Sequence, residues 1–239
     1  MRKPALSFLC VVIFSIALLS CKNDSYLMDP PVIRDQSFVE EFDTMQNAYN
    51  RGWRWLNRST PIGVNNWGQG PGTALMMSYS SKGTNSGFAY ATYEGTAGTN
   101  NGVISNWLVS PQLMMQNGDK IVFFTKTELT DATSAGRDYG ARLQVAFNKS
   151  GDLSVGNGND PGNFDNVLLD INATEEEYFT SFPSPVAFPG DWTRFEAKVQ
   201  GLSAPVKGRF AFRYFLHNAG SNGAGLGIGV DSVAYIGKH

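Results

Sequence analysis

From residue 36 onward, apolar residues come in short runs that clusters of Gly, Asn, Ser and Pro separate. Several runs alternate: Phe210, Phe212 and Tyr214 fall on one face of an extended segment, and Arg209 and Arg213 fall on the other. A period of two is that of a β-strand with one buried face. The runs predict strands at residues 37–43, 52–57, 74–80, 87–93, 103–110, 120–129, 139–148, 166–171, 191–199, 208–217 and 227–236.

These runs do not alternate with helical patterns, and only the acidic piece at residues 174–178 has helical character. Many short strands with loop punctuation indicate an all-β, antiparallel fold of two packed sheets, a jelly-roll β-sandwich. Two connections, residues 151–162 and 218–227, are rich in Gly and Asn. They either link hairpins or form a site, and the pattern does not decide between these roles.

The N-terminus has the pattern of an export signal. Arg2 and Lys3 precede an almost uninterrupted apolar run over residues 6–19, which ends at Ser20 and Cys21. A permanent membrane-spanning helix needs about 20 apolar residues, so this run is short for that role. Its length suits a signal peptide, which we predict to cover residues 1–20.

The ending Leu18-Leu19-Ser20-Cys21 resembles the bacterial lipobox. That resemblance implies that the Cys21 thiol carries a lipid and that the chain is anchored to a membrane. The polar stretch that follows, up to residue 35, has no amphipathic period and is predicted to be a flexible tether. Its start, residues 22–24, weakly resembles the export tag of surface lipoproteins of the Bacteroidota, which favours an outer-membrane, cell-surface location.

The composition limits the kinds of site and partner that the mature chain can have. Cys10 lies in the predicted leader and Cys21 is the predicted lipid site, so no other thiol remains for a disulfide or thiolate chemistry. Loss of Arg2 and Lys3 with the leader changes the formal charge from −2 to −4. Without a basic excess, nucleic acid is not an expected partner. Residues 36–239 are enough for one sandwich with its own core.

Three ordered groups of motifs run through nearly the whole mature chain. The middle group reads Trp107-Leu108-Val109-Ser110-Pro111 and leads into the apolar strand at residues 120–124. Together the three groups resemble the choice-of-anchor J domain and the related cleaved-adhesin domains of gingipain-type haemagglutinins. The groups are residues 38–43, 52–53 and 66–67, then 106–113 and 120–124, then 191–193, 209–214 and 228–233.

This resemblance implies a jelly-roll sandwich on a bacterial cell surface, with an adhesive or ligand-binding role and, in relatives, structural calcium. Asp231 interrupts an apolar final strand, and a buried carboxylate must be paired or bind a metal. First and last strands commonly neighbour each other in jelly rolls, so Asp231 can meet Glu40 or Glu41 and hold Ca²⁺. Alternatively, Asp231 caps a turn or pairs with an Arg such as Arg209.

Enzyme motifs are missing from the sequence. A histidine-based metal site or a Ser-His-Asp triad would depend on His217, because the other histidine is the terminal His239. No G-x-S-x-G or HExxH pattern occurs. The run at residues 38–43 echoes laminarinase-type hydrolases, but their E-x-D-x-x-E catalytic strand is absent. We therefore predict that the protein is not an enzyme, and glycoside hydrolysis is disfavoured.

Binding is the favoured function. Aromatic residues are numerous, and an exposed Trp or Tyr offers a flat apolar face for sugars. The predicted ligand-binding residues are Trp67 and Asn66 in a Gly/Asn-rich stretch, Trp53, and Asn222 in the 218–227 connection. We expect a non-catalytic adhesin-like domain that binds a glycan or a host or matrix protein. A glycan-capture lipoprotein of a polysaccharide-uptake system and a structural envelope component are the alternatives.

Overall fold

The computed structural model describes residues 34–80, 84–131 and 135–238. Residues 35–239 form one compact unit. The predicted signal peptide, Cys21 and the tether up to residue 33 lie outside the described residues. Among the residues that are described, no helix is both long and apolar enough to cross a membrane.

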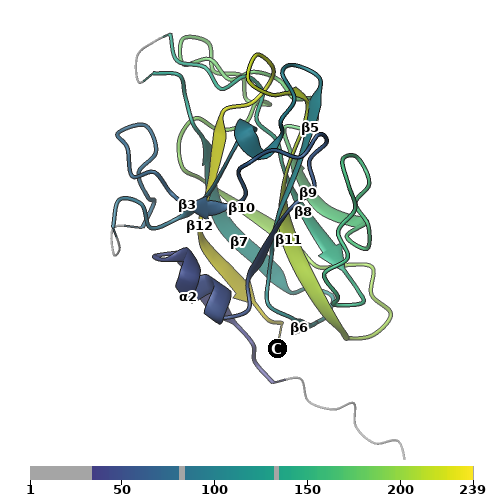
Figure 1. Ribbon diagram of the computed structural model, residues 1–239. Coiled ribbons are helices and arrows are strands. Elements are labelled where there is room, and N and C mark those ends of the chain that lie inside the picture. The colour runs from purple at the N-terminus through teal and green to yellow at the C-terminus, as the bar shows by residue number, and fades with distance from the viewer. Residues whose placement is uncertain (1–33, 81–83, 132–134, 239) are drawn as a thin grey trace, which may run out of the picture. The chain divides into compact units, whose positions relative to one another are not determined.

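Two six-stranded antiparallel sheets make up this unit (Figure 1). The first, called sheet A, has the order β10 (Thr193–Lys198), β7 (Lys120–Thr127), β12 (Gly227–Ile236), β4 (Ala89–Thr92), β3 (Gly68–Gln69), with β1 (Phe38–Glu40) also paired to β12. The second, called sheet B, has the order β2 (Arg54–Asn57), β5 (Gly102–Val109), β11 (Val206–Ala219), β8 (Leu143–Asn148), β9 (Asn166–Ile171), with β6 (Leu113–Met115) also paired to β11. The all-β, two-sheet prediction is confirmed.

The core lies between the inner faces of the two sheets. Phe210, Phe212 and Tyr214 of β11 are fully buried, as their alternation predicted. Phe212 packs edge-on against Phe123 of sheet A at 4.8 Å between ring centroids, and Phe210 stacks on Tyr235 of β12 at 6.2 Å. Such aromatic pairs add to the stabilisation from the apolar area they bury, and they join the two layers.

Short elements and irregular segments depart from the predictions. Residues 74–80, predicted as a strand, have no regular structure, and residues 174–178 form no helix. The described residues instead contain a helix, α2 (Met45–Asn50), whose N-cap Thr44 accepts a hydrogen bond from the Asn47 N–H, and a 3₁₀ turn, η2 (Tyr93–Gly95). The prediction that the first and last strands lie side by side is confirmed, because β1 pairs with β12.

Strand β12 connects the two ends of the sandwich. It begins at Gly227, directly after the β11–β12 connection, and its residues 233–235 pair with β1, where the chain enters the unit. Ten residues at about 3.3 Å each span roughly 30 Å. The β11–β12 connection and the C-terminus therefore lie at opposite ends, as the top and bottom of Figure 1 show.

Candidate binding cleft

A cleft of about 700 Å³ opens at the end of the sandwich that carries the β11–β12 connection. One side is formed by Asn218, near the end of β11, and by residues of this connection, including Asn222. The other side carries Tyr93 of η2 and a group of polar and aromatic side chains from two further connections. These are Thr130, Arg137, Tyr139 and Glu177.

Three extended segments form the wall that carries these side chains. The Thr130 N–H donates to the Arg137 carbonyl (3.0 Å), and Arg137 forms a β-bridge with Phe179. The Thr180 N–H donates to the carbonyl of Gly136 (2.9 Å). We call residues 128–131, 136–139 and 177–180 the cleft wall. Its backbone hydrogen bonds make it a small sheet outside the two main layers.

Asp138 fixes the base of the cleft wall. Its side chain is fully buried, and its carboxylate accepts hydrogen bonds from the backbone N–H groups of Gly140 (2.9 Å), Ala141 (3.1 Å) and Tyr178 (2.7 Å). Burial raises the pKa of Asp138, and the three N–H groups oppose that rise because they favour the charged form. The neighbouring Tyr139 is held at a positive φ of 58°, which places its ring at the cleft.

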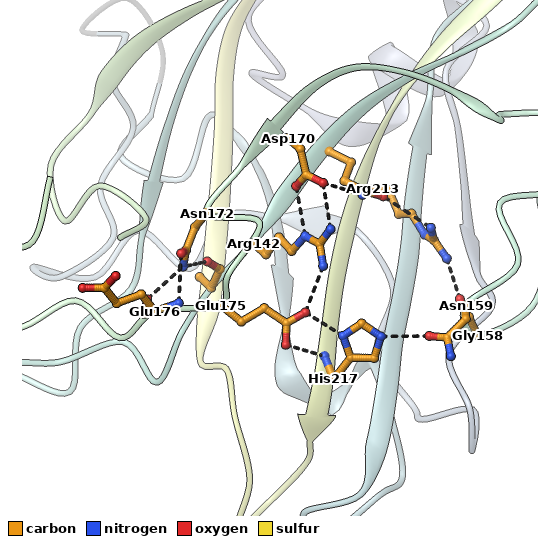
Figure 2. A network of polar contacts seen from close by, with 11 residues as sticks. Arg142, Gly158, Asn159, Asp170, Asn172, Glu175, Glu176, Arg213 and His217 are labelled. Atoms are coloured by element: carbon orange, nitrogen blue, oxygen red, sulfur yellow. Dashed lines mark hydrogen bonds and ion pairs between the residues drawn. The ribbon is translucent and has the colours of Figure 1, made fainter. Parts of the chain in front are cut away.

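A second polar network supports the wall from the outer side of sheet B (Figure 2). The Glu175 carboxylate accepts from Arg142 Nη1 (3.0 Å) and contacts His217 Nδ1 (2.6 Å). Arg142 also makes a two-pronged ion pair with Asp170 (2.9 and 2.7 Å). The Asn172 side chain donates to the Glu176 carbonyl and accepts from its N–H (2.8 and 2.9 Å). This network fixes the turn that leads to Glu177 in the cleft.

The β11–β12 connection needs glycine where its backbone passes close to other groups. A Cβ atom on Gly220 would lie 2.0 Å from the Gly98 carbonyl oxygen, and one on Gly225 would lie 2.6 Å from the Tyr214 hydroxyl. Both glycines have a positive φ, which side chains disfavour. The Gly225 N–H donates to the Tyr139 carbonyl (2.8 Å), so the two sides of the cleft are joined at its floor.

The ion pair inside the cleft is weak. Arg137 lies over the Tyr139 ring, 4.0 Å from its centroid, and its guanidinium is 3.5 Å from the Glu177 carboxylate. Both charged side chains are about two-fifths exposed, and exposed pairs contribute little to stability. A ligand can therefore take over their hydrogen bonds at low cost. The cleft offers aromatic faces, amides and one charge of each sign.

His217 belongs to the same polar network as Glu175 and Arg142. His217 has both ring nitrogens engaged, Nδ1 with Glu175 and Nε2 with Asn159 Oδ1 (3.0 Å). Glu175 is in turn bound to Arg142.

Of the four predicted ligand-binding residues, only Asn222 lines the cleft, where it is exposed. The predictions for Trp67 and Trp53 are wrong, because these rings are 2% and 1% exposed and belong to the core. The Trp67 Nε1–H donates to the Asn106 carbonyl (2.9 Å), which satisfies its polar edge inside the sandwich. The half-buried Asn66 side chain accepts from the Trp67 N–H (2.8 Å) and closes a local turn instead.

The three predicted calcium ligands do not form one cluster, although Glu41 and Asp231 both bind Ser232. Glu40 is buried and pairs with Arg51, and Glu41 accepts from the Ser232 hydroxyl. Asp231 accepts from the backbone N–H groups of Tyr79 (2.8 Å), Ser80 (3.1 Å) and Ser232 (2.7 Å). N–H donors repel a cation, so these residues do not fit Ca²⁺. No cluster of three His, Cys, Asp or Glu suited to a metal occurs among the described residues.

Among the described residues, Asp231 neither caps a local turn nor pairs with an Arg; its carboxylate binds backbone N–H groups of the irregular segment 74–80. Arg209, the other partner considered, instead donates to the carbonyls of Ser110 and Gly151 (both 2.7 Å). The sequence reasoning missed Arg137, Tyr139 and Glu177 as cleft residues. The one available signal was the Gly/Asn-rich connection at 218–227, which forms the opposite side of the cleft.

Comparison with solved structures identifies the fold. The K1 cleaved adhesin domain of Lys-gingipain from Porphyromonas gingivalis is 20% identical, with a TM-score of 0.50, covering 85% of this chain and 99% of that domain. The K3 cleaved adhesin domain of the same protein is 21% identical, with a TM-score of 0.49 and coverages of 86% and 100%. The chain thus has the cleaved-adhesin fold, as the three motif groups predicted.

Neither a family model nor a curated protein matches the sequence.

Proposed function

We propose that this protein is a cell-envelope lipoprotein whose domain binds a glycan, without catalysis, in the cleft beside the β11–β12 connection. The observation that carries the proposal is the cleft itself, about 700 Å³, with two tyrosine rings beside amide and charged side chains. Sugars pair apolar C–H faces with hydroxyl groups, and Tyr rings with planar polar groups match both. Ligand sites are commonly such concave surfaces with a few convergent polar groups.

Within the unit, the cleft lies far from the point where the chain enters. The chain enters at residue 35, and β12 places the cleft about 30 Å from that entry, at the other end of the sandwich. The cleaved adhesin domains that share the fold are named for adhesion, in agreement with a binding role.

Glycan arrays with the purified full chain test the proposal. Defined oligosaccharides should bind, and Asn222→Ala should weaken that binding by about fivefold, since one lost hydrogen bond costs about 1 kcal/mol. Asn50→Ala is the matched control, because Asn50 is an exposed residue of α2 that does not line the cleft. Glu177→Gln should also weaken binding, because it removes the charge opposite Arg137.

Three results would contradict the proposal. Binding that Asn222→Ala and Glu177→Gln leave unchanged would place the ligand elsewhere on the domain. Adherence to extracellular-matrix proteins without any glycan binding would replace the glycan with a protein ligand. Tight co-purification with another envelope protein, with neither activity, would favour a structural role.

A further inference from the structure

A second pocket, of about 250 Å³, lies on the other side of the cleft wall. Side chains of successive residues in an extended segment point to opposite faces. Thr130 and Glu177 accordingly line the cleft, whereas their neighbours Leu129 and Tyr178 line this pocket. We call it the Lys126 pocket, after the residue that projects into it from the outer face of β7.

Lys126 is a half-buried cation without a carboxylate partner. Its ammonium group donates to the Leu75 carbonyl (3.0 Å), which is its one hydrogen bond among the described residues. It takes part in none of the ion pairs that those residues form. Burial lowers the pKa of Lys126, and the charges of Asp191 and Glu128 only partly oppose this. A desolvated charge is costly unless it is paired, so an anion that enters the pocket would be stabilised.

The other groups of the pocket restrict which anion fits. Asp191 is exposed at the pocket and repels a second negative charge, but its carboxylate can accept hydrogen bonds from hydroxyls. The Tyr178 hydroxyl has no hydrogen-bond partner among the described residues and can donate or accept. A Cβ atom on Gly190 would lie 2.6 Å from the Tyr178 ring, so only glycine lets that ring close the pocket.

We propose that the Lys126 pocket binds a uronic acid residue of an acidic glycan. The sugar carboxylate pairs with the Lys126 ammonium, and ring hydroxyls donate to Asp191 and to the Tyr178 oxygen. A free sulfate dianion or a dicarboxylate would place additional charge near Asp191, whereas a uronic acid carries one carboxylate and several hydroxyls. The proposal adds a second site to the proposed glycan-binding function and does not require the cleft to be occupied.

Saturation-transfer NMR with the full chain tests this inference directly. D-galacturonate and D-glucuronate should show transfer from the protein, whereas galactose and glucose at the same concentration should show at least fivefold less. Lys126→Met keeps most of the apolar stem and removes the charge, so it should abolish the uronate signal. Lys207→Met is the matched control, because Lys207 is an exposed lysine on β11, outside the pocket. An unchanged circular dichroism spectrum verifies that each variant is folded.

Equal transfer to uronates and neutral sugars would overturn the inference, as would a uronate signal that survives Lys126→Met. Ionic strength gives a second measurement: the uronate signal should fall between 20 and 500 mM NaCl, because a half-exposed ion pair is screened. The two proposals can fail independently of each other. If Asn222→Ala loses array binding and no uronate signal is seen, the cleft remains as a glycan site and the Lys126 pocket does not. If a uronate signal is seen without array binding, the Lys126 pocket remains and the cleft does not.

Discussion

The outer faces of the two sheets are covered by segments that each bind a buried charged side chain of the sheet below, and these two charges are opposite. On sheet B the connection between β8 and β9 crosses the face, and Arg213, 3% exposed, donates to its Gly158 and Asp160 carbonyls. On sheet A the segment 74–80 crosses the face, and Asp231, fully buried, accepts from its Tyr79 and Ser80 N–H groups. The cationic Arg213 thus binds backbone carbonyls, and the carboxylate of Asp231 binds backbone N–H groups.

We call the β8–β9 connection, residues 149–165, the sheet B cover, and residues 74–80 the sheet A cover. The two covers differ in the side chains that lie beneath them. Under the sheet B cover is a closed apolar cluster that includes Trp107 and Phe164, and the Arg213 guanidinium lies 4.7 Å from the Trp107 ring centroid. The sheet A cover leaves Met77 and Tyr79 about 45% exposed. Because the sheet A cover buries less apolar surface, its local opening should cost less free energy than opening of the sheet B cover.

The largest expected effect is that of Arg213→Met. This substitution removes hydrogen bonds to the Gly158 carbonyl and the Ser105 hydroxyl, and it removes the stacking on Phe215 at 3.8 Å. We expect a loss of about 3 kcal/mol in the free energy of unfolding, typical of hydrogen bonds to a buried charged group. Urea denaturation measures it, with Arg194→Met, an exposed arginine on sheet A, as the control that should change little. A loss below about 1 kcal/mol would show that Arg213 does not hold the cover.

Asp231→Ala should have a smaller global effect, about 2 kcal/mol, because the freed N–H groups of the sheet A cover can reach water. Its local effect should be larger: amide hydrogen exchange in residues 74–80 should accelerate at least tenfold. Exchange in residues 150–165 should remain unchanged in the same protein. Equal acceleration in both segments would mean that the two covers open together, against the comparison.

The next largest effect is the pH dependence of the free energy of unfolding, which should amount to about 1 kcal/mol. Burial raises the pKa of Asp231 to about 6, from an ordinary 3.8. The folded protein therefore retains a proton that the unfolded chain loses, so this group's contribution to stability is fully present below about pH 4 and is lost as pH rises through 6. Between pH 5 and 6.5, the wild type should lose about 1 kcal/mol relative to Asp231→Asn, which cannot titrate. A constant difference in melting temperature across this range would refute the assignment.

Tyr79→Ala should have the smallest effect, about 0.7 kcal/mol. The Tyr79 ring stacks on Phe124 at 3.7 Å between centroids, but it is partly exposed. Thermal unfolding should show a small decrease, with hydrogen exchange again faster only in residues 74–80. Phe182→Ala, at an 83% exposed position, is a control for loss of an exposed ring and should leave both measurements unchanged.

The strands of the two main sheets were predictable because each one buries a face. Alternation in β11 and near-continuous apolar runs in β5 and β7 follow from the core that they share. Residues 74–80 looked like another such run, but their backbone amides pair with Asp231 rather than with a strand. Nothing in that local pattern reveals a partner about 150 residues away.

The cleft was less predictable because its residues come together only through tertiary contacts. Arg137, Tyr139 and Glu177 stand in stretches without a recognisable motif, and Asp138 orders them by collecting N–H groups from both sides of the wall. Trp67 shows the converse error. Its Asn/Gly-rich surroundings indicate an exposed loop, yet the Asn106 carbonyl gives the indole N–H a partner inside the core.

Strand β12 has a mechanical consequence. A ligand held at the β11–β12 connection and a chain held at residue 35 would pull on opposite ends of the sandwich, along the direction of this strand. Its hydrogen bonds to β7 on one side and to β4 and β1 on the other would then be loaded together, in shear, instead of being broken one after another. Under such a load, β12 would carry the tension from the β11–β12 connection to the end of the unit where residue 35 lies, through the strand that pairs with β1, β4 and β7.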